Sequence, residues 1–167
     1  LNIIALQDSQ PERLDAFSQD LVSTGIAQTD LKELLDLFEH ASTFGSLIQI
    51  PQAFSRKLPD LETKLNTASE SGDIFVQQLL PLVQQAKLLA KQYDAVIANP
   101  PYMGGKGMNP ALKDFAKKKF PDSKSDLFAM FIERGFEWCK DSGFNSMVTM
   151  QSWMFLSSYE AMREKLL

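Results

Sequence analysis

The sequence has little of the two residues that most often crosslink chains or hold soft metals. It contains one cysteine, Cys139, and one histidine, His40. A single cysteine cannot form an internal disulfide, so nothing indicates an oxidising compartment, and we expect Cys139 to be packed inside a helix. We expect His40 to lie at the surface or near a helix end. The ligand count excludes a zinc site, and we predict no bound metal.

Long apolar runs and a large excess of one charge are also missing. No apolar run approaches the length that spans a bilayer, so we predict no membrane contact. The net charge of -4 argues against a protein that is basic all over. Lysines nevertheless crowd the segment after residue 102, namely Lys106, Lys113, Lys117, Lys118, Lys119 and Lys124. A local basic patch can contact phosphates on an acidic protein, but a solvated helix face is the alternative, and both stay open here.

The chain of 167 residues suits one domain or part of a larger one. It begins Leu1-Asn2-Ile3-Ile4 without an initiator methionine, and residues 161–167 continue a helical pattern. We expect it to be a piece of a longer protein, holding one truncated domain in two parts, residues 1–92 and 93–167.

The first part is mostly helical in pattern. The apolar run from Leu1 to Leu6 predicts a buried first strand, and Ser46 to Ile50 predicts a second, short one. Pro11 suits the first turn of a helix, and Pro81 predicts a kink or break in another. The expected helices run from Pro11 through Phe17, Leu21 and Val22, from Thr29-Asp30, over Leu58–Ala68 and over Asp73–Lys91. We interpret this part as a first strand followed by a helical insertion.

The second part alternates between strand and helix. The expected order is a buried strand at Tyr93–Ala98, a loop at Met103–Pro110, a short helix at Pro110–Lys119, a helix from Ser125-Asp126 through Cys139, a strand at Phe144–Met150 and a terminal helix from Ser157 or Ser158. Such alternation builds a parallel sheet with crossover helices. The predicted fold class is therefore α/β.

The run Asn99-Pro100-Pro101-Tyr102 directly follows the strand predicted at Tyr93–Ala98. A residue before proline is held in extended geometry, and each proline has a fixed φ and no N–H. In open α/β sheets, ligands bind beyond the carboxyl ends of the strands. The four residues therefore predict a stiff bracket that presents the Asn99 side chain and the Pro100 carbonyl at the ligand-binding edge.

This bracket suits the methylation of a planar amino group. The Asn99 side-chain oxygen and the Pro100 carbonyl can accept hydrogen bonds from the two N–H groups of that amino group. This favours a pyramidal nitrogen whose lone pair points at a methyl donor, and positioning then carries the rate. Tyr102 offers a flat face to a planar target, and a base in a duplex must flip out to reach it. The structural alternative is a strand end stiffened by prolines.

The segment Tyr93–Tyr102 resembles the catalytic motif of the adenine-N6 DNA methyltransferases, Ser125–Arg134 resembles the helix that follows it, and Phe144–Met150 the next strand. Among these enzymes it is most similar to the BREX phage-defence methyltransferases and the fused type II restriction-methylation enzymes. The resemblance implies a bacterial cytoplasmic enzyme with a partial Rossmann-like, class I methyltransferase sheet. It also implies S-adenosylmethionine as cofactor and double-stranded DNA as partner. The implied catalytic residues are Asn99, Pro100, Pro101 and Tyr102, and the implied cofactor contacts are Asn99, Asp126, Leu127 and Phe128. From the lysine-rich segment, Lys106, Lys113, Lys117 and Lys118 are the candidates for DNA contact.

One departure from the family pattern limits these expectations. No glycine-rich cofactor loop with a following acidic residue precedes Asn99, and Gly104–Gly107 follows the motif and lacks the Ser or Thr of a phosphate loop. We therefore expect the chain alone to bind no S-adenosylmethionine and to be inactive. Methylation of a protein glutamine or of RNA, and a non-catalytic interaction module, remain alternatives. Sheet edges exposed by truncation could also pair two chains into a dimer.

Overall fold

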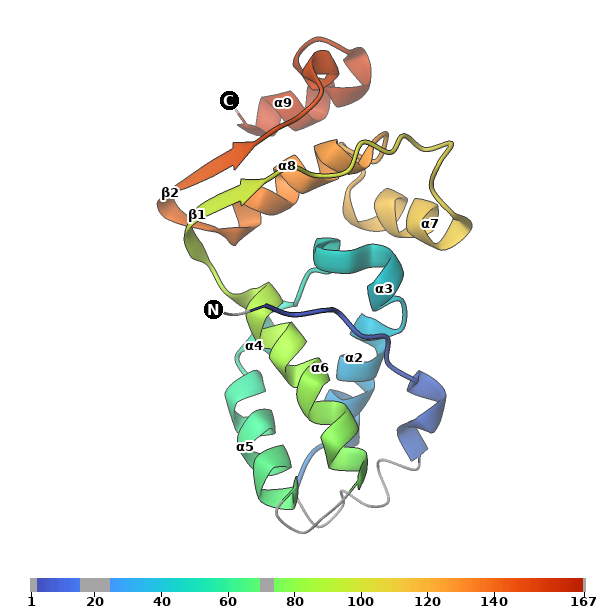
Figure 1. The fold of residues 1–167 in the computed structure, drawn as a ribbon, viewed down its shortest axis with the longest axis vertical. Helices are drawn as coiled ribbons and strands as arrows, with labels where there is room; N and C mark the ends of the chain where they lie inside the picture. Colours follow the sequence, from blue (N-terminus) through green and yellow to red (C-terminus); the bar gives the residue numbers. More distant parts are fainter. Residues whose placement is uncertain (1–2, 16–24, 70–73, 167) are drawn as a thin grey trace. The chain divides into compact units, whose positions relative to one another are not determined.

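The computed structural model describes residues 3–15, 25–69 and 74–166 (Figure 1). It divides into two units, Leu1–Lys91 and Gln92–Leu167. We call them the helical unit and the sheet unit and describe each by itself. That both belong to one truncated domain stays a prediction.

The helical unit is built from short and medium helices. They are η1 (Pro11–Arg13), α2 (Gln28–Phe38), α3 (Ala41–Phe44), η3 (Gly45–Leu47), α4 (Gln52–Ser55), α5 (Leu58–Ser69) and α6 (Ile74–Ala90). The helices expected over Leu58–Ala68 and Asp73–Lys91 are confirmed as α5 and α6. α6 is continuous across Pro81, so the expected break is wrong. Phe17, Leu21 and Val22 lie outside the described residues.

The core of this unit forms where α6 packs against α5 and α2. Apolar residues at helical spacing give each helix one buried face, as an amphipathic pattern predicts. In α2 these residues are Leu31, Leu34, Leu35 and Phe38, and in α5 they are Leu58, Leu61 and Leu65. α6 supplies Val76, Leu79, Val83 and Ala86 between them.

Both strands expected in the first part are wrong for the residues described. Residues 3–6 form no strand, and Ile3 is 82% exposed. The residues that follow are instead hydrogen-bonded to helices. The Gln7 N–H donates to Gln85 Oε1 of α6 (2.6 Å), and the Ser9 N–H donates to the Phe38 carbonyl of α2 (2.9 Å). Where the second strand was expected, at Ser46–Ile50, residues Gly45–Leu47 form a 3₁₀ turn. A strand needs a hydrogen-bonding neighbour, and the described part of this unit contains no strand.

The start of α2 also differs from the expectation. The helix begins at Gln28 after Ala27, one residue ahead of the predicted Thr29-Asp30 start, and no side chain caps it. Asp30 instead pairs with Lys57 across 2.6 Å.

The sheet unit contains two parallel strands, β1 (Tyr93–Ala98) and β2 (Cys139–Met147), joined through α7 (Pro110–Lys119) and α8 (Leu127–Trp138). η4 (Gln151–Met154), η5 (Ser157–Tyr159) and α9 (Glu160–Leu166) complete it. Figure 1 shows the chain leaving the tip of β1 towards α7 and returning through α8 to β2. The α/β class and the parallel pairing expected for this part are confirmed.

The two strands differ in detail from the expectation. α8 ends at Trp138, and Cys139 begins β2, so Cys139 is not inside a helix. β2 starts earlier than the predicted Phe144 because Cys139 pairs with Tyr93. Ladder hydrogen bonding continues one residue past Met147, where the Val148 N–H donates to the Ala98 carbonyl (3.0 Å).

A bulge separates the two ends of the strand pair. Tyr93 pairs with Cys139 and Ala95 pairs with Phe144, so Asp94 alone faces residues 140–143. Ser142 takes a positive φ of 64°. A side chain at Gly143 would lie 3.0 Å from the Lys140 carbonyl and 3.1 Å from that of Asp94, so any residue other than glycine would require the backbone to shift by a few tenths of an ångström.

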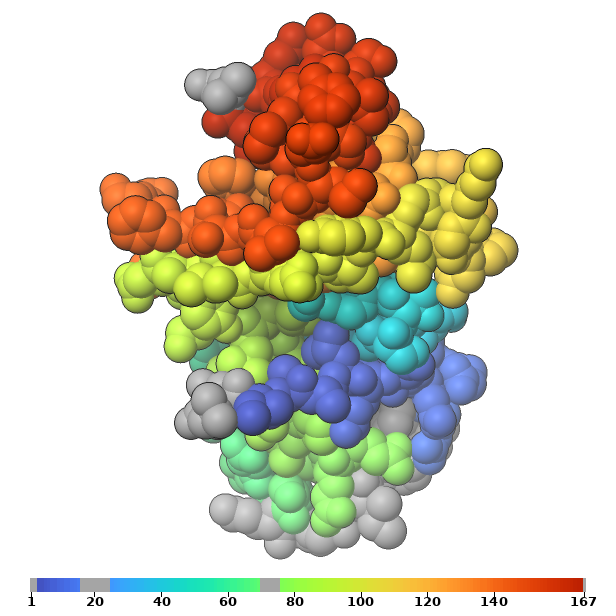
Figure 2. Space-filling view, turned by 45° about the horizontal axis from the view of Figure 1, so that its top comes forward, coloured from blue at the N-terminus to red at the C-terminus, as the bar shows by residue number. Residues whose placement is uncertain are grey.

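One face of the strand pair is packed and the other is open. α8 contacts both strands, and the core behind it consists of Phe128, Ala129, Ile132, Tyr159 and Met162. The opposite face carries Ile97 (82% exposed) and Phe144 (75% exposed). In Figure 2, β1 and the segment after it lie at the surface of the face shown. β1 is therefore not the buried strand that the sequence predicts.

Candidate functional site

The predicted bracket lies at the carboxyl end of β1, where the sequence places it. Ala98 ends the strand and is tied to β2 through the hydrogen bond from the Val148 N–H. Asn99 is exposed, Pro100 is buried and Pro101 is exposed. The buried proline anchors the run to the unit, and the asparagine side chain is accessible to a ligand.

Tyr102 is held at two points and open at the rest of its surface. Its hydroxyl donates to the Val148 carbonyl (3.1 Å), which belongs to the extension of β2. Its ring meets Phe128 of α8 edge to face, with centroids 6.0 Å apart and planes at 87°. About half of the residue remains exposed, at 49%. The structure therefore holds a half-exposed aromatic ring three residues after the exposed Asn99.

The start of α8 binds the chain that follows Tyr102. Asp126 caps the helix through the Phe128 N–H (3.3 Å), and the same oxygen, Oδ1, accepts from the Met103 N–H (2.9 Å). The Met103 carbonyl in turn accepts from the Leu127 N–H (3.1 Å), and the Gly105 N–H donates to the Ser125 carbonyl (3.1 Å). The predicted helix start at Ser125-Asp126 is confirmed, with Asp126 as its cap.

The predicted cofactor contacts have different surroundings. Leu127 is 7% exposed and Phe128 is 1% exposed, so both are core residues. Phe128 lies between Tyr102 and Tyr159, whose ring centroid is 6.1 Å away. Burial, and then the negative charge of Asp126, raises the pKa of Tyr159 above its ordinary 10.0. The role of Asp126, Leu127 and Phe128 towards a cofactor stays a prediction.

The predicted DNA contacts lie on the loop after the bracket and on α7. Asn109 caps this helix by accepting from the Leu112 N–H (2.8 Å), and Pro110 occupies its first turn. Lys106 in the loop and Lys117 and Lys118 near the helix end are exposed, while Lys113 is half-buried. Cations also stabilise a helix carboxyl end, so this basic surface has a structural explanation besides DNA contact, and the contact stays a prediction.

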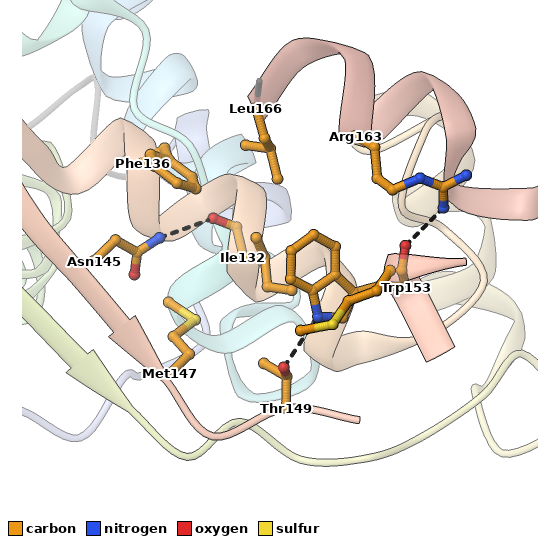
Figure 3. Close-up of a pocket in the computed structure, with 9 residues that line it drawn as sticks. Ile132, Phe136, Asn145, Met147, Thr149, Trp153, Arg163 and Leu166 are labelled. Carbon is orange, nitrogen blue, oxygen red and sulfur yellow. Dashed lines mark hydrogen bonds between the residues drawn. The ribbon is translucent and has the colours of Figure 1, made fainter. Parts of the chain in front are cut away.

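A pocket that the sequence did not predict lies on the packed side of β2 (Figure 3). It has a volume of about 480 Å³ and is lined by Ile132, Phe136, Asn145, Met147, Thr149, Trp153, Met154, Arg163 and Leu166. The Trp153 indole donates to Thr149 Oγ1 (3.2 Å), and Arg163 Nη1 donates to the Trp153 carbonyl (2.7 Å). Most of its lining is apolar, so it is poorly suited to a charged ligand.

Asn145 is the polar exception on the packed side. Its Nδ2 donates to the Ile132 carbonyl (3.3 Å), and its Oδ1 is buried without a partner among the described residues. The Asn145 side chain fits there because residue 135 is a glycine. Any side chain at Gly135 would come within 2.6 Å of the Asn145 amide. The signal in the sequence was a polar residue at an inward-facing strand position, opposite a glycine of the preceding helix.

Two classes of site are absent from the described part of the chain. Its carboxylates, histidine and cysteine form no group that could hold a metal ion. No helix in the same ranges is long and apolar enough to cross a membrane.

The sequence has relatives among known proteins. The chain belongs to the Eco57I restriction-modification methylase family, whose model matches residues 6–167. It is 47% identical to the adenine-specific methyltransferase BrxX of Escherichia coli O9:H4 (strain HS) over its whole length, and 34% identical to the adenine-specific methyltransferase PglX of Lacticaseibacillus casei (strain Zhang) over 99% of it. These matches confirm the family expected from the sequence.

A more distant relative combines two activities in its name. The type II restriction enzyme and methyltransferase RM.Eco57I of Escherichia coli is 29% identical over 62% of the chain. The chain spans only 16%, 14% and 12% of the lengths of these three relatives. Each of these relatives is therefore a much longer protein than these 167 residues.

Proposed function

We propose that this chain is the catalytic-motif part of an S-adenosylmethionine-dependent DNA adenine-N6 methyltransferase of restriction-modification or phage defence. The observation that supports this is the bracket itself. An exposed Asn99 follows directly from a parallel strand, and three residues later a half-exposed Tyr102 is held by Val148, just past β2, and by Phe128 of α8. The family and the adenine-specific relatives support the same assignment.

In this proposal each bracket residue has one task. The Asn99 side-chain oxygen and the Pro100 carbonyl accept hydrogen bonds from the target amino group and hold its lone pair in one direction. Pro101 keeps the two acceptors in a fixed relation, and Tyr102 stacks on the flipped base. S-adenosylmethionine supplies an activated methyl group when it is bound, so the contribution of the protein is orientation and stabilisation of developing charge.

The finer fold belongs to the proposal too. Two parallel strands with a connecting helix on one face fit the catalytic edge of a Rossmann-like class I methyltransferase sheet. The cofactor contacts in this chain would be Asn99, Asp126, Leu127 and Phe128. The glycine-rich loop would come from elsewhere in the parent protein.

DNA is the substrate class that the chain favours. Lys106, Lys113, Lys117 and Lys118 follow the bracket along the chain and supply positive charge for phosphates. Because the relatives are named adenine-specific, a base is favoured over a protein glutamine. RNA methylation, glutamine methylation and a non-catalytic role are outcomes that the following experiment separates, and pairing of two chains through sheet edges is a separate question.

The test is Asn99→Ala in the full-length parent protein, assayed with labelled S-adenosylmethionine on unmethylated genomic DNA, on RNA and on protein. Loss of an acceptor for the reacting amino group should lower N6-methyladenine formation by about 10²–10³-fold, as removal of a preorganised polar contact does elsewhere. Asn66→Ala, an exposed asparagine of α5, is the matched control and should retain activity. Undiminished DNA methylation by Asn99→Ala, or methylation of RNA or protein alone by the unmodified enzyme, contradicts the proposal.

A further inference from the structure

We propose that Asp126 is a positioning residue that sets the place of Tyr102 by binding the N–H of Met103, its neighbour in the chain, and the N–H of Phe128, which its ring contacts. The inference rests on the proposed function and concerns the same site. It gives Asp126 a role argued from its contacts, beside the one that the resemblance implies.

One oxygen of Asp126 joins two segments that are distant in the sequence. Oδ1 accepts from the Met103 N–H (2.9 Å), immediately after Tyr102, and from the Phe128 N–H (3.3 Å), in the first turn of α8. An isolated bridge between Gly104 and Asp126 adds backbone pairing next to these contacts. The carboxylate therefore fixes the chain after the bracket relative to the helix start.

Both fixed segments determine where the Tyr102 ring lies. Met103 is its neighbour along the chain, and Phe128 is the residue that its ring contacts edge to face. Phe128 is 1% exposed and packs on Tyr159, so it cannot follow Tyr102 if the loop moves. The other anchors are the hydroxyl bond to the Val148 carbonyl and the backbone bond from the Leu127 N–H to the Met103 carbonyl. Without the Asp126 carboxylate, the ring would keep these anchors and lose the hold on the Met103 N–H.

One oxygen of the carboxylate is already engaged by the protein. Oδ1 is occupied by the two backbone N–H groups. A carboxylate at a helix N-terminus is also stabilised there by the helix dipole and by capping, which gives Asp126 a sufficient reason to be acidic. The contact with Met103 is the part that capping alone does not explain.

The test compares Asp126→Ala with Asp126→Asn in the full-length parent protein. Asparagine retains the Oδ1 acceptor without the charge, and alanine removes it. For Asp126→Ala we expect kcat on unmethylated genomic DNA to fall by about 10²-fold, because small displacements of a positioning group cost that much. The KM for S-adenosylmethionine should change by less than about twofold. Asp126→Asn should restore kcat to within about threefold of the unmodified enzyme.

Two further variants separate positioning from general loss of structure. Asp114→Ala on α7 removes an exposed carboxylate as a matched control and should leave both constants unchanged. Adding Asp126→Ala to Tyr102→Ala should lower kcat little beyond Tyr102→Ala alone, because Asp126 acts through that ring. Circular dichroism of each variant shows whether it is folded, and Asp126→Asn decides the question if Asp126→Ala is not.

Several results would overturn the inference. These are an unchanged kcat for folded Asp126→Ala, a rise of about tenfold or more in the KM for S-adenosylmethionine with kcat preserved, or an Asp126→Asn variant that has lost as much kcat as Asp126→Ala. Absence of DNA methylation by the unmodified enzyme would instead contradict the proposed function and would be visible before any variant is made.

Discussion

The helical unit and the sheet unit treat their apolar side chains in opposite ways. In the described part of the helical unit, the exposed large apolar residues are Ile3 and Ile4, next to the N-terminus. In the sheet unit they line the open face of the strands and the segments after them, and include Ile97, Phe144, Val148, Met150, Met154, Phe155 and Leu156. The first unit encloses its core, and the second has a core on one side of the sheet only.

This difference separates stability from function within one chain. The helices α2, α5 and α6 bury their apolar faces against one another, so substitutions there should act on folding. The sheet unit keeps Asn99 and half of Tyr102 accessible at the strand end, so substitutions there should act on chemistry. An exposed apolar sheet face is also the kind of surface that other chain covers in a larger protein.

The strongest test of the comparison replaces one phenylalanine in each unit of the 167-residue chain. Phe38→Ala should lower the free energy of unfolding of the helical unit by about 3–5 kcal/mol, since Phe38 is fully buried. Phe144→Ala should change that of the sheet unit by no more than about 0.5 kcal/mol, because the side chain is exposed. Denaturant titration measures both changes. Tryptophan fluorescence reports on the sheet unit, because both tryptophans, Trp138 and Trp153, belong to it, and far-UV circular dichroism reports on the helices. A large cost for Phe144→Ala would show that its face is covered even in this chain.

A smaller effect is expected from Gly135→Ala inside the packed side of the sheet unit. The added methyl group would lie 2.4 Å from Met147 Cε and 2.6 Å from the Asn145 amide, so the side chains must shift. We expect this unit to lose about 1–3 kcal/mol of stability, and denaturant titration monitored by tryptophan fluorescence measures the loss. Gly105→Ala is the control, because nothing lies within 4 Å of its new methyl group. Equal effects of the two substitutions would argue against tight packing at Gly135.

The smallest expected effect is a pH-dependent change in the stability of the helical unit. Hydrogen bonds from the Ser42 N–H and hydroxyl, both 2.7 Å long, lower the pKa of Asp8 below its ordinary 3.8. A lowered carboxyl pKa adds stability that is complete above pH 3.8 and is lost as the pH falls through the lower folded-state value. The stability difference between the unmodified chain and Asp8→Asn should therefore shrink in acid. Circular dichroism melts across this pH range measure it, and a difference independent of pH would contradict the expectation.

Patterns confined to neighbouring residues predicted the structure well. The apolar spacing in α2, the strand Tyr93–Ala98, the helix Pro110–Lys119 and the helix start at Ser125-Asp126 are all confirmed. In each case the signal lies within a few turns of chain, although the partners of α2 and β1, which are α6 and β2, lie farther along it. The placement of Asn99 at a strand end follows from the same local information.

Features that depend on distant partners were predicted less well. Residues 3–6 have the composition of a strand but pack along helices, and Cys139 joins β2 because Tyr93 is available to pair with it. The tie between Asp126 and Met103, and the pocket beside Asn145, need the loop and both strands to be in place first. The spacing of residues within one segment does not predict such contacts between residues that are far apart in the sequence.

The bulge opposite Asp94 gives the two ends of the strand pair different tolerance to changes in length. At residues 140–143 the chain already loops out, so inserted residues can extend the loop without altering the alignment of Ala98 with Met147. An insertion between Phe144 and Val148 would reverse which side chains face α8 and would carry the Val148 carbonyl away from Tyr102. A short epitope or fluorophore attachment sequence therefore belongs at the bulge, where it would report on this unit without disturbing the bracket.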